Sequence, residues 1–123
     1  MESSLLTVAA LIALAGTVFH GVAGGKIYMG HIKASELMPL TQSLSLVSWQ
    51  MFTVFLVVSG ATLLCVAMKP NLALLAYPVL VGNALGAALF LLLGVTGHAR
   101  LLKLPGTYLM ALTALLGVMG LPS

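Results

Sequence analysis

Charge is what this sequence has least of. Charged residues make up 6% of the 123 positions, five of them basic and two acidic, whereas 61% of the residues are hydrophobic. A water-soluble domain has about 25% charged residues, which cover its surface. The chain lacks that polar surface, so we expect the lipid bilayer to be its main surroundings. Five scattered basic residues are also too few for a nucleic-acid-binding surface, and no nucleic-acid partner is expected.

Cysteine and carboxylate groups are almost as scarce. The single cysteine, Cys65, excludes a disulfide framework. The two acidic residues, Glu2 and Glu36, lie outside the long apolar runs, so no carboxylate pair is expected inside a membrane. The sequence contains no CxxCH haem-attachment motif, no phosphate-binding loop and no nucleophile–base pair. We therefore expect a protein that is not an enzyme and that has no bound cofactor and no metal site.

Four long apolar runs dominate what is present, over residues 5–23, 44–68, 72–96 and 104–121. About 20 helical residues cross the hydrocarbon layer of a bilayer. Helices satisfy their own backbone hydrogen bonds in lipid, and the runs lack the alternating pattern of barrel strands. The sequence predicts an all-α fold, a bundle of four transmembrane helices that forms a single membrane domain over residues 1–123.

The basic residues predict the orientation of this bundle. Four of them lie in the first and third connections: Lys26, Lys33, Arg100 and Lys103. The second connection holds only Lys69. Cytoplasmic loops carry the excess of Lys and Arg, so both termini are expected on the non-cytoplasmic side. We expect the protein in a bacterial inner membrane.

The first connection, residues 24–43, is predicted to be the cytoplasmic loop and is the longest one. Its apolar residues, among them Ile27, Ile32 and Leu37, are consistent with an amphipathic segment in the membrane interface. An ordinary connecting loop with some helical turns explains them equally well.

Small residues recur at helical spacing in the apolar runs. Ala9, Ala13, Gly16 and His20 share one face of the first helix. Gly82 and Gly86 form a GxxxG motif in the third, and the fourth contains Ala114, Gly117 and Gly120. Small residues allow helix backbones to approach closely in lipid. The contacts they predict are either within the bundle or with a second copy or a larger membrane complex.

His20 is the most unusual polar residue, because it lies near the end of an apolar run. An imidazole in hydrocarbon needs a hydrogen-bond partner. Gln50, near the start of the second helix, lies at a similar depth and is the favoured partner; Ser48, Thr53 and Thr96 are alternatives. Haem or metal ligation by His20 together with His98 or His31, or a proton relay through His20, are further interpretations.

Asn83 is the polar residue nearest the middle of a predicted span. We expect its amide to bond to another helix, which is the usual arrangement for an amide in a membrane. A contact to a pore or to a transported substrate is the alternative.

One resemblance covers most of the chain. It rests on an intramembrane His20, the pair Gly24-Gly25, a basic loop with Pro39, and a Trp-polar pair, Trp49-Gln50, at the start of the second helix. This layout resembles a group of small bacterial four-helix membrane proteins with no assigned activity, in which the pair is Trp-His. The resemblance implies the fold and the membrane location but no activity.

Two functions follow as expectations. The first is a non-enzymatic accessory subunit that packs against itself or against a larger membrane complex. The second is a small homo-oligomeric transporter or channel in which Asn83, His20 and Gln50 line the path.

Overall fold

The protein is all-α, as the sequence predicts, and has no strand in the described part of the chain. A computed structural model describes residues 2–122. Its first helical rod runs from α1 (Glu2–Val18) through a π-helix, η1 (Phe19–Gly24), into α2 (Gly25–Lys33). The second rod is α3 (Pro39–Met68). Then follow the 3-10 helix η2 (Pro70–Leu75), α4 (Ala76–Val95), the 3-10 helix η3 (Ala99–Lys103) and α5 (Pro105–Met119).

Proline and glycine set most of these boundaries. Pro39, Pro70 and Pro105 each open a helix, where the missing N–H is not needed. After α4 the chain turns at Gly97, whose φ of 133° is a conformation that residues with a side chain rarely adopt. Local residues, mainly proline and glycine, therefore determine where most helices begin and end.

Three helical segments are long and apolar enough to cross a membrane, so the chain is a membrane protein by this criterion. They span 32 residues (Glu2–Lys33), 30 residues (Pro39–Met68) and 26 residues (Pro70–Val95). The fourth, α5, is apolar but has only 15 residues.

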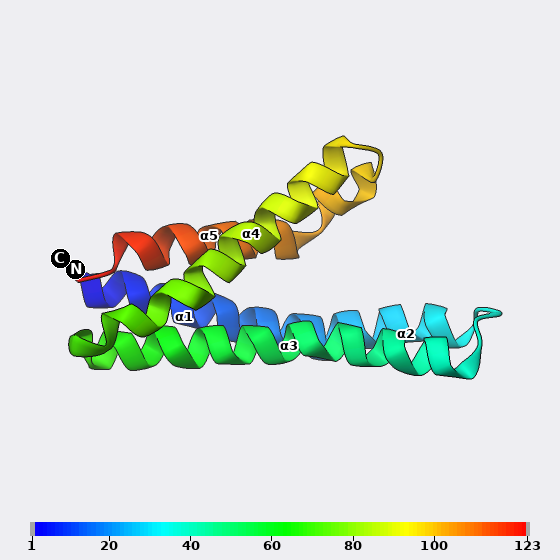
Figure 1. The fold of residues 1–123 in the computed structure, drawn as a ribbon, viewed down its shortest axis with the longest axis horizontal. Helices are drawn as coiled ribbons and strands as arrows, with labels where there is room; N and C mark the ends of the chain where they lie inside the picture. The colour runs from blue at the N-terminus through cyan, green and yellow to red at the C-terminus, as the bar shows by residue number, and fades with distance from the viewer. Residues whose placement is uncertain (1, 123) are drawn as a thin grey trace.

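The two rods, α4 and α5 meet tightly at the end that holds both termini (Figure 1). Ser3 Oγ donates a hydrogen bond to the carbonyl oxygen of Ala67 at 3.0 Å. A Cβ on Gly120, directly after α5, would lie 2.8 Å from the backbone nitrogen of Leu6 in α1, so these two backbones almost touch. The main apolar core lies at this end: Leu6, Ala9, Ala10, Leu63, Val66, Ala67, Ala76, Val79 and Leu80.

Away from this shared end, the molecule divides into two arms. One arm is a long hairpin in which α1, η1 and α2 run antiparallel to α3, and the other is the hairpin of α4, η3 and α5 (Figure 1). The second arm diverges from the first and is shorter. The fold is therefore a four-helix bundle at one end and two separate hairpins at the other.

The first connection differs from the expected loop. Residues 24–43 were predicted as a cytoplasmic loop, but α2 continues the first helix to Lys33 and α3 begins already at Pro39. Only residues 34–38 form the turn. The segment is also not a helix lying across the hairpin in the interface plane, because it prolongs both rods along their own axes (Figure 1).

Candidate functional site

A row of five aromatic and imidazole rings runs along the long hairpin around His20. The imidazole of His20 stacks on the indole of Trp49, with ring centroids 4.1 Å apart and an interplanar angle of 10°. Tyr28 stacks on the same indole at 4.3 Å. Phe52 meets the imidazole edge-on at 4.9 Å and lies 5.9 Å from Phe55. We call these five residues the aromatic row.

The hydrogen bond of His20 goes to Thr53, and the prediction that Gln50 is its favoured partner is wrong. His20 Nδ1 lies 3.0 Å from Thr53 Oγ1. Thr53 is one turn beyond Trp49 in α3, so the indole and the hydroxyl lie on the same helix face. Gln50 is exposed and lies next to Trp49 in sequence, where a helix turns its side chain about 100° away from that face.

The π-helix gives His20 a second bond to α3. In η1 the N–H of Gly25 bonds to the carbonyl oxygen of His20, five residues back. The same carbonyl oxygen accepts a hydrogen bond from Trp49 Nε1 at 3.1 Å. A carbonyl oxygen has two lone pairs, so both bonds are satisfied. Both the side chain and the backbone of His20 are therefore fixed to α3 at a site of altered helix geometry, a feature frequent at functional sites.

Three glycines make this close contact sterically feasible. A Cβ on Gly21 would lie 2.9 Å from Thr53 Cγ2, and one on Gly24 would lie 3.0 Å from Trp49 Cζ2. A Cβ on Gly25 would lie 3.3 Å from Trp49 Nε1. The glycine-rich sequence after His20 thus provides the space that Trp49 and Thr53 occupy.

Helix lengths predict that the aromatic row lies near one surface of the bilayer. Because the rods are aligned at the shared end, the 20 residues of α4 match residues 2–21 of the first rod and residues 49–68 of α3 in length. Twenty helical residues rise about 30 Å, the thickness of the hydrocarbon layer. We therefore expect His20 and Trp49 near one boundary of this layer, where Trp and Tyr side chains concentrate.

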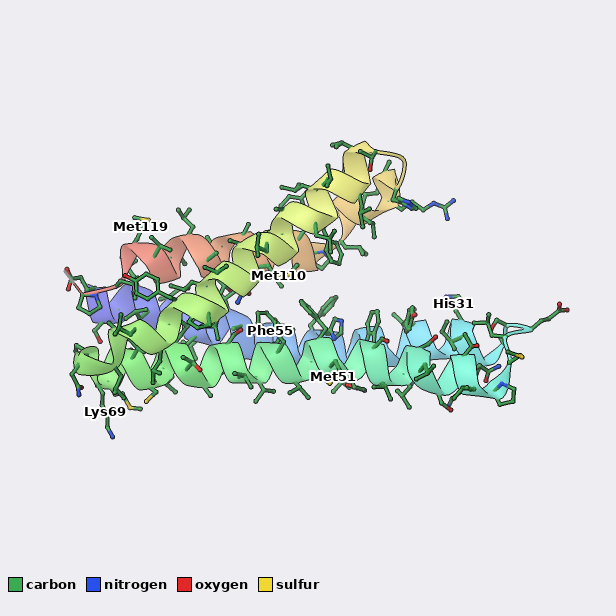
Figure 2. All side chains as sticks on the ribbon, in the orientation of Figure 1. His31, Met51, Phe55, Lys69, Met110 and Met119 are labelled. Atoms are coloured by element: carbon green, nitrogen blue, oxygen red, sulfur yellow. The ribbon has the colours of Figure 1, made fainter. Side chains whose placement is uncertain are left out.

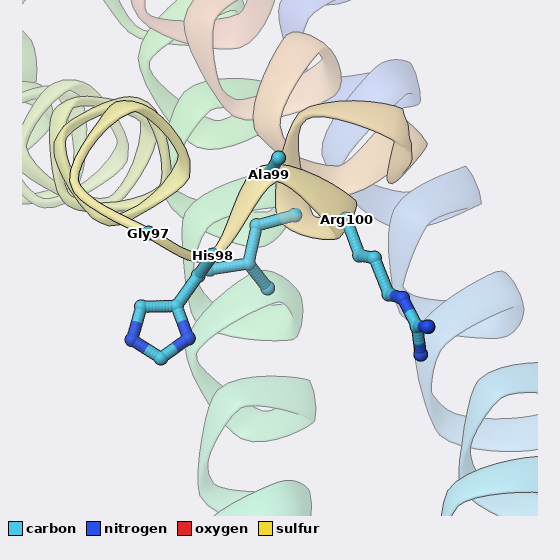
Figure 3. Close-up of a pocket in the computed structure, with 5 residues that line it drawn as sticks. Gly97, His98, Ala99 and Arg100 are labelled. Carbon is cyan, nitrogen blue, oxygen red and sulfur yellow. The ribbon is translucent and has the colours of Figure 1, made fainter.

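His98 is not part of this site. It follows α4, at the end of the shorter arm, and lines a hollow with the residues of η3 (Figure 3). His31 lies near the tip of the long hairpin, and Lys69 lies at the other end of the molecule (Figure 2). The structure thus does not bring the three histidines together. Within residues 2–122, no group of three or more His, Cys, Asp or Glu side chains is placed to hold a metal ion.

Asn83 lies in the core where α3 and α4 meet. Its side chain is fully buried, and Nδ2 donates to Ser59 Oγ at 3.1 Å and to the carbonyl oxygen of Val79 at 2.8 Å. The amide thus bonds across to another helix. Asn83 Oδ1 and Thr107 Oγ1 are buried without a hydrogen-bond partner among the described residues.

The predicted packing glycines contact different helices. A Cβ on Gly82 would lie 2.8 Å from the ring of Phe55, which extends from α3 toward α4 (Figure 2). A Cβ on Gly86 would lie 2.8 Å from Met110 Sδ in α5. The GxxxG motif therefore serves two contacts rather than one groove. At Gly16 a Cβ would have only an ordinary contact, 3.8 Å from Leu56.

Sequence reasoning missed three rings of the aromatic row and the partner of Asn83. Trp49, Phe52, Phe55 and Ser59 follow one another at spacings of three, three and four residues in α3. This spacing places them on one helix face. This spacing could have indicated a shared helix face, but nearly every residue of the run is apolar, so no single face stands out.

Comparison of the chain with protein-family models, with curated proteins and with solved structures finds no match.

Proposed function

We propose that this protein is a non-enzymatic, self-associating subunit of a bacterial inner membrane, whose contact surface is the projecting end of the long hairpin. The observation that carries the proposal is the mismatch in length between the arms. The first rod has 32 residues and α3 has 30, whereas the segment Pro70–Val95 has 26 and its helix α4 diverges from the hairpin. The long hairpin therefore extends beyond the end of α4 (Figure 1).

The projecting end, residues 22–48, carries apolar side chains that this protomer leaves uncovered. Ile27, Met38 and Leu40 expose 66%, 70% and 68% of their surface. Other exposed apolar residues there are Val22, Leu37, Leu44, Leu46 and Val47. Lipid tails do not cover a surface that lies beyond the hydrocarbon layer. Burial of apolar surface is worth about 25 cal/mol per Å², so this patch favours a protein contact.

A second copy of the chain is the occupant that we propose. Twofold dimers are the commonest oligomers, and one self-complementary contact would cover the same patch on both protomers. Two helical hairpins that pair side by side would form a four-helix bundle, in which apolar faces are buried on one another. This arrangement needs no further component.

The alternative, a transporter or channel lined by Asn83, His20 and Gln50, has less support. Asn83 is sealed in the core by Ser59 and Val79. The side-chain bond of His20 to Thr53 holds it to α3, and Gln50 lies on an exposed part of the same helix. The three side chains do not share one surface of the protomer, so a path along them would require a rearranged bundle.

Cysteine cross-linking in native membranes tests the proposal. In a Cys65→Ala background, Leu44→Cys places a thiol on the projecting end and Leu115→Cys places one on an exposed position of α5 as the matched control. Mild oxidation is expected to give a species of twice the 12.7 kDa chain mass for Leu44→Cys but not for Leu115→Cys.

Three results would count against this proposal. A monomeric mass in mild detergent together with no cross-link at Leu44 would exclude self-association. A cross-link of another mass would indicate a different membrane protein as the partner. Equal dimer yields at both positions would indicate random collision.

A further inference from the structure

The tip of the shorter arm contains a hollow that the proposed function does not use. It has a volume of about 410 Å³ and is lined by Gly97, His98, Ala99, Arg100 and Leu101. Figure 3 shows that His98 and Arg100 both extend from the loop on the same side of the ribbon. Leu101 adds an apolar side chain to the lining, whereas Gly97 and Ala99 add little or none.

This loop is held in place by contacts to both of its neighbouring helices. The N–H of His98 donates to the carbonyl oxygen of Leu93 at 2.9 Å. Tyr108 Oη, in α5, donates to the carbonyl oxygen of Leu102 at 2.6 Å. Gly94, in α4, is buried, and a Cβ at this position would collide with the side chain of Leu102. The hollow is therefore built into the fold and does not form only when a ligand arrives.

The charge of the loop fits an anion. Arg100 lines the hollow and Lys103 closes the same 3-10 helix. The only acidic residues of the chain are Glu2, at the shared end, and Glu36, in the turn of the long hairpin. A guanidinium group binds phosphate oxygens in a bidentate manner, and an imidazole N–H adds a further donor.

The expected depth of the loop in the membrane favours a lipid headgroup over free phosphate as the anion. The 20 residues of α4 rise about 30 Å, so the loop that follows lies at the level of the lipid headgroups. Exposed apolar residues flank it, with Leu92 and Val95 before the hollow and Leu104 after it. A phosphate bound here would leave its acyl chains beside an apolar surface.

We propose that the hollow at residues 97–101 binds the phosphate of an anionic phospholipid headgroup, with Arg100 and His98 as its ligands. The site is independent of self-association, because it lies on the other arm. Arg100 holds the phosphate oxygens, His98 donates from the opposite wall, and the acyl chains lie along α4 and α5.

Lipid titration of the full chain in neutral detergent tests this site. The probe is fluorescent phosphatidylglycerol, with labelled phosphatidylcholine for comparison. Arg100→Gln is expected to weaken phosphatidylglycerol binding about tenfold, since a hydrogen bond to a charged group is worth at least that factor. His98→Gln is expected to weaken it less. Lys103→Gln removes the same charge from the same 3-10 helix outside the hollow, and is expected to leave binding nearly unchanged.

The outcomes distinguish a specific lipid site from diffuse electrostatic attraction and from a site for free phosphate. Equal losses for Arg100→Gln and Lys103→Gln would show diffuse attraction to basic residues and would overturn the proposal. Displacement of the lipid by an equal concentration of inorganic phosphate would indicate a site for free phosphate and would overturn the assignment to lipid. All three substituted residues are exposed, so unchanged melting of the variants confirms that the fold is intact.

Discussion

At the scale of the residue, His20 shows how one polar group is accommodated in an apolar helix. Its Nδ1 bonds to Thr53, its carbonyl oxygen accepts from Trp49, and its ring stacks on Trp49 and meets Phe52 edge-on. A polar group buried without a partner costs about 1–3 kcal/mol, and here both Nδ1 and the carbonyl oxygen have one. His20 therefore fixes the register of the two rods of the long hairpin.

The first prediction concerns this bond. His20→Ala and Thr53→Val are each expected to lower the free energy of unfolding, because each leaves the other polar group without its partner. The double variant is expected to lose less than the sum, with a coupling of about 0.6 kcal/mol, typical of hydrogen bonds between membrane helices. Unfolding in a denaturing detergent measures all three variants. Gln50→Ala is the control and is expected to have little effect; strict additivity for His20 and Thr53 would contradict the bond.

The second prediction compares two glycines between α1 and α3. At Gly60 a Cβ would lie 2.6 Å from Leu14 Cγ and 3.2 Å from the carbonyl oxygen of Ala10, whereas at Gly16 it has ordinary space. Gly16→Ala is expected to raise stability by up to about 1 kcal/mol, because alanine favours the helix. Gly60→Ala is expected to lower stability, since the steric conflict outweighs that gain. Thermal melting of the two variants checks the opposite signs, and a shift in the same direction for both would be inconsistent with this packing.

At the scale of the element, the helices of the shorter arm are held by close contacts, in which small residues face large ones. Gly86 faces Met110, and Gly117 faces Leu80. Lipid provides no hydrophobic force between helices, so van der Waals contact has to hold them together. The exposed small residues of α4, Ala84 and Ala88, are not part of this contact.

The third prediction follows from that difference. Gly86→Leu is expected to separate α4 from α5 and to lower the yield of folded protein, because a leucine side chain takes the place of Met110. Ala88→Leu, two residues away on the exposed side, is expected to be tolerated. Folded yield after solubilisation in mild detergent measures both. Equal yields would place Gly86 at the lipid surface.

The fourth prediction concerns the projecting end of the long hairpin. Single cysteines in a Cys65→Ala background at Ala34 and Glu36, exposed residues of the turn outside the apolar patch, are expected to react with a membrane-impermeant maleimide, because the turn is expected to lie beyond the hydrocarbon layer. Cysteines at Val57 and Leu89, which are exposed in the protomer but are expected within that layer, should be protected by lipid. Labelling of inside-out vesicles makes the comparison. Protection at Ala34 and Glu36 would show that the hairpin tilts into the bilayer.

At the scale of the whole molecule, charge and shape are arranged along one axis. The basic residues of the first and third connections lie at the two arm tips, while Lys69 lies at the shared end with both termini (Figures 1 and 2). The positive-inside rule therefore predicts that the two arm tips lie in the cytoplasm.

The fifth prediction tests this orientation. A cytoplasmic reporter fused within the turn at Ser35 is expected to be active, and the same reporter fused at the C terminus is expected to be inactive. A periplasmic reporter is expected to give the reverse pattern. Equal activity of one reporter at both positions would place them on the same side of the membrane and would exclude the three crossings expected between them.

What the sequence determined by itself was the set of elements. The scarcity of charge and the four apolar runs predict membrane helices, because the backbone in lipid has to bond within its own segment. Proline and glycine predict where most helices begin and end. Helical spacing also placed Ala9, Ala13 and Gly16 on one face, and all three are buried.

What only the tertiary structure decided was which side chains meet and how far the helices extend. Depth along a helix suggested Gln50 for His20, but the rotation of α3 presents Thr53. Residues 24–43 resembled a loop because their local pattern is mixed, yet each half prolongs a rod that is stabilised by the other. The divergence of the two arms and the projection of the long hairpin depend on contacts between segments distant in sequence. No local pattern of residues specifies such contacts, because the helices of a bundle select their neighbours by the fit of whole surfaces.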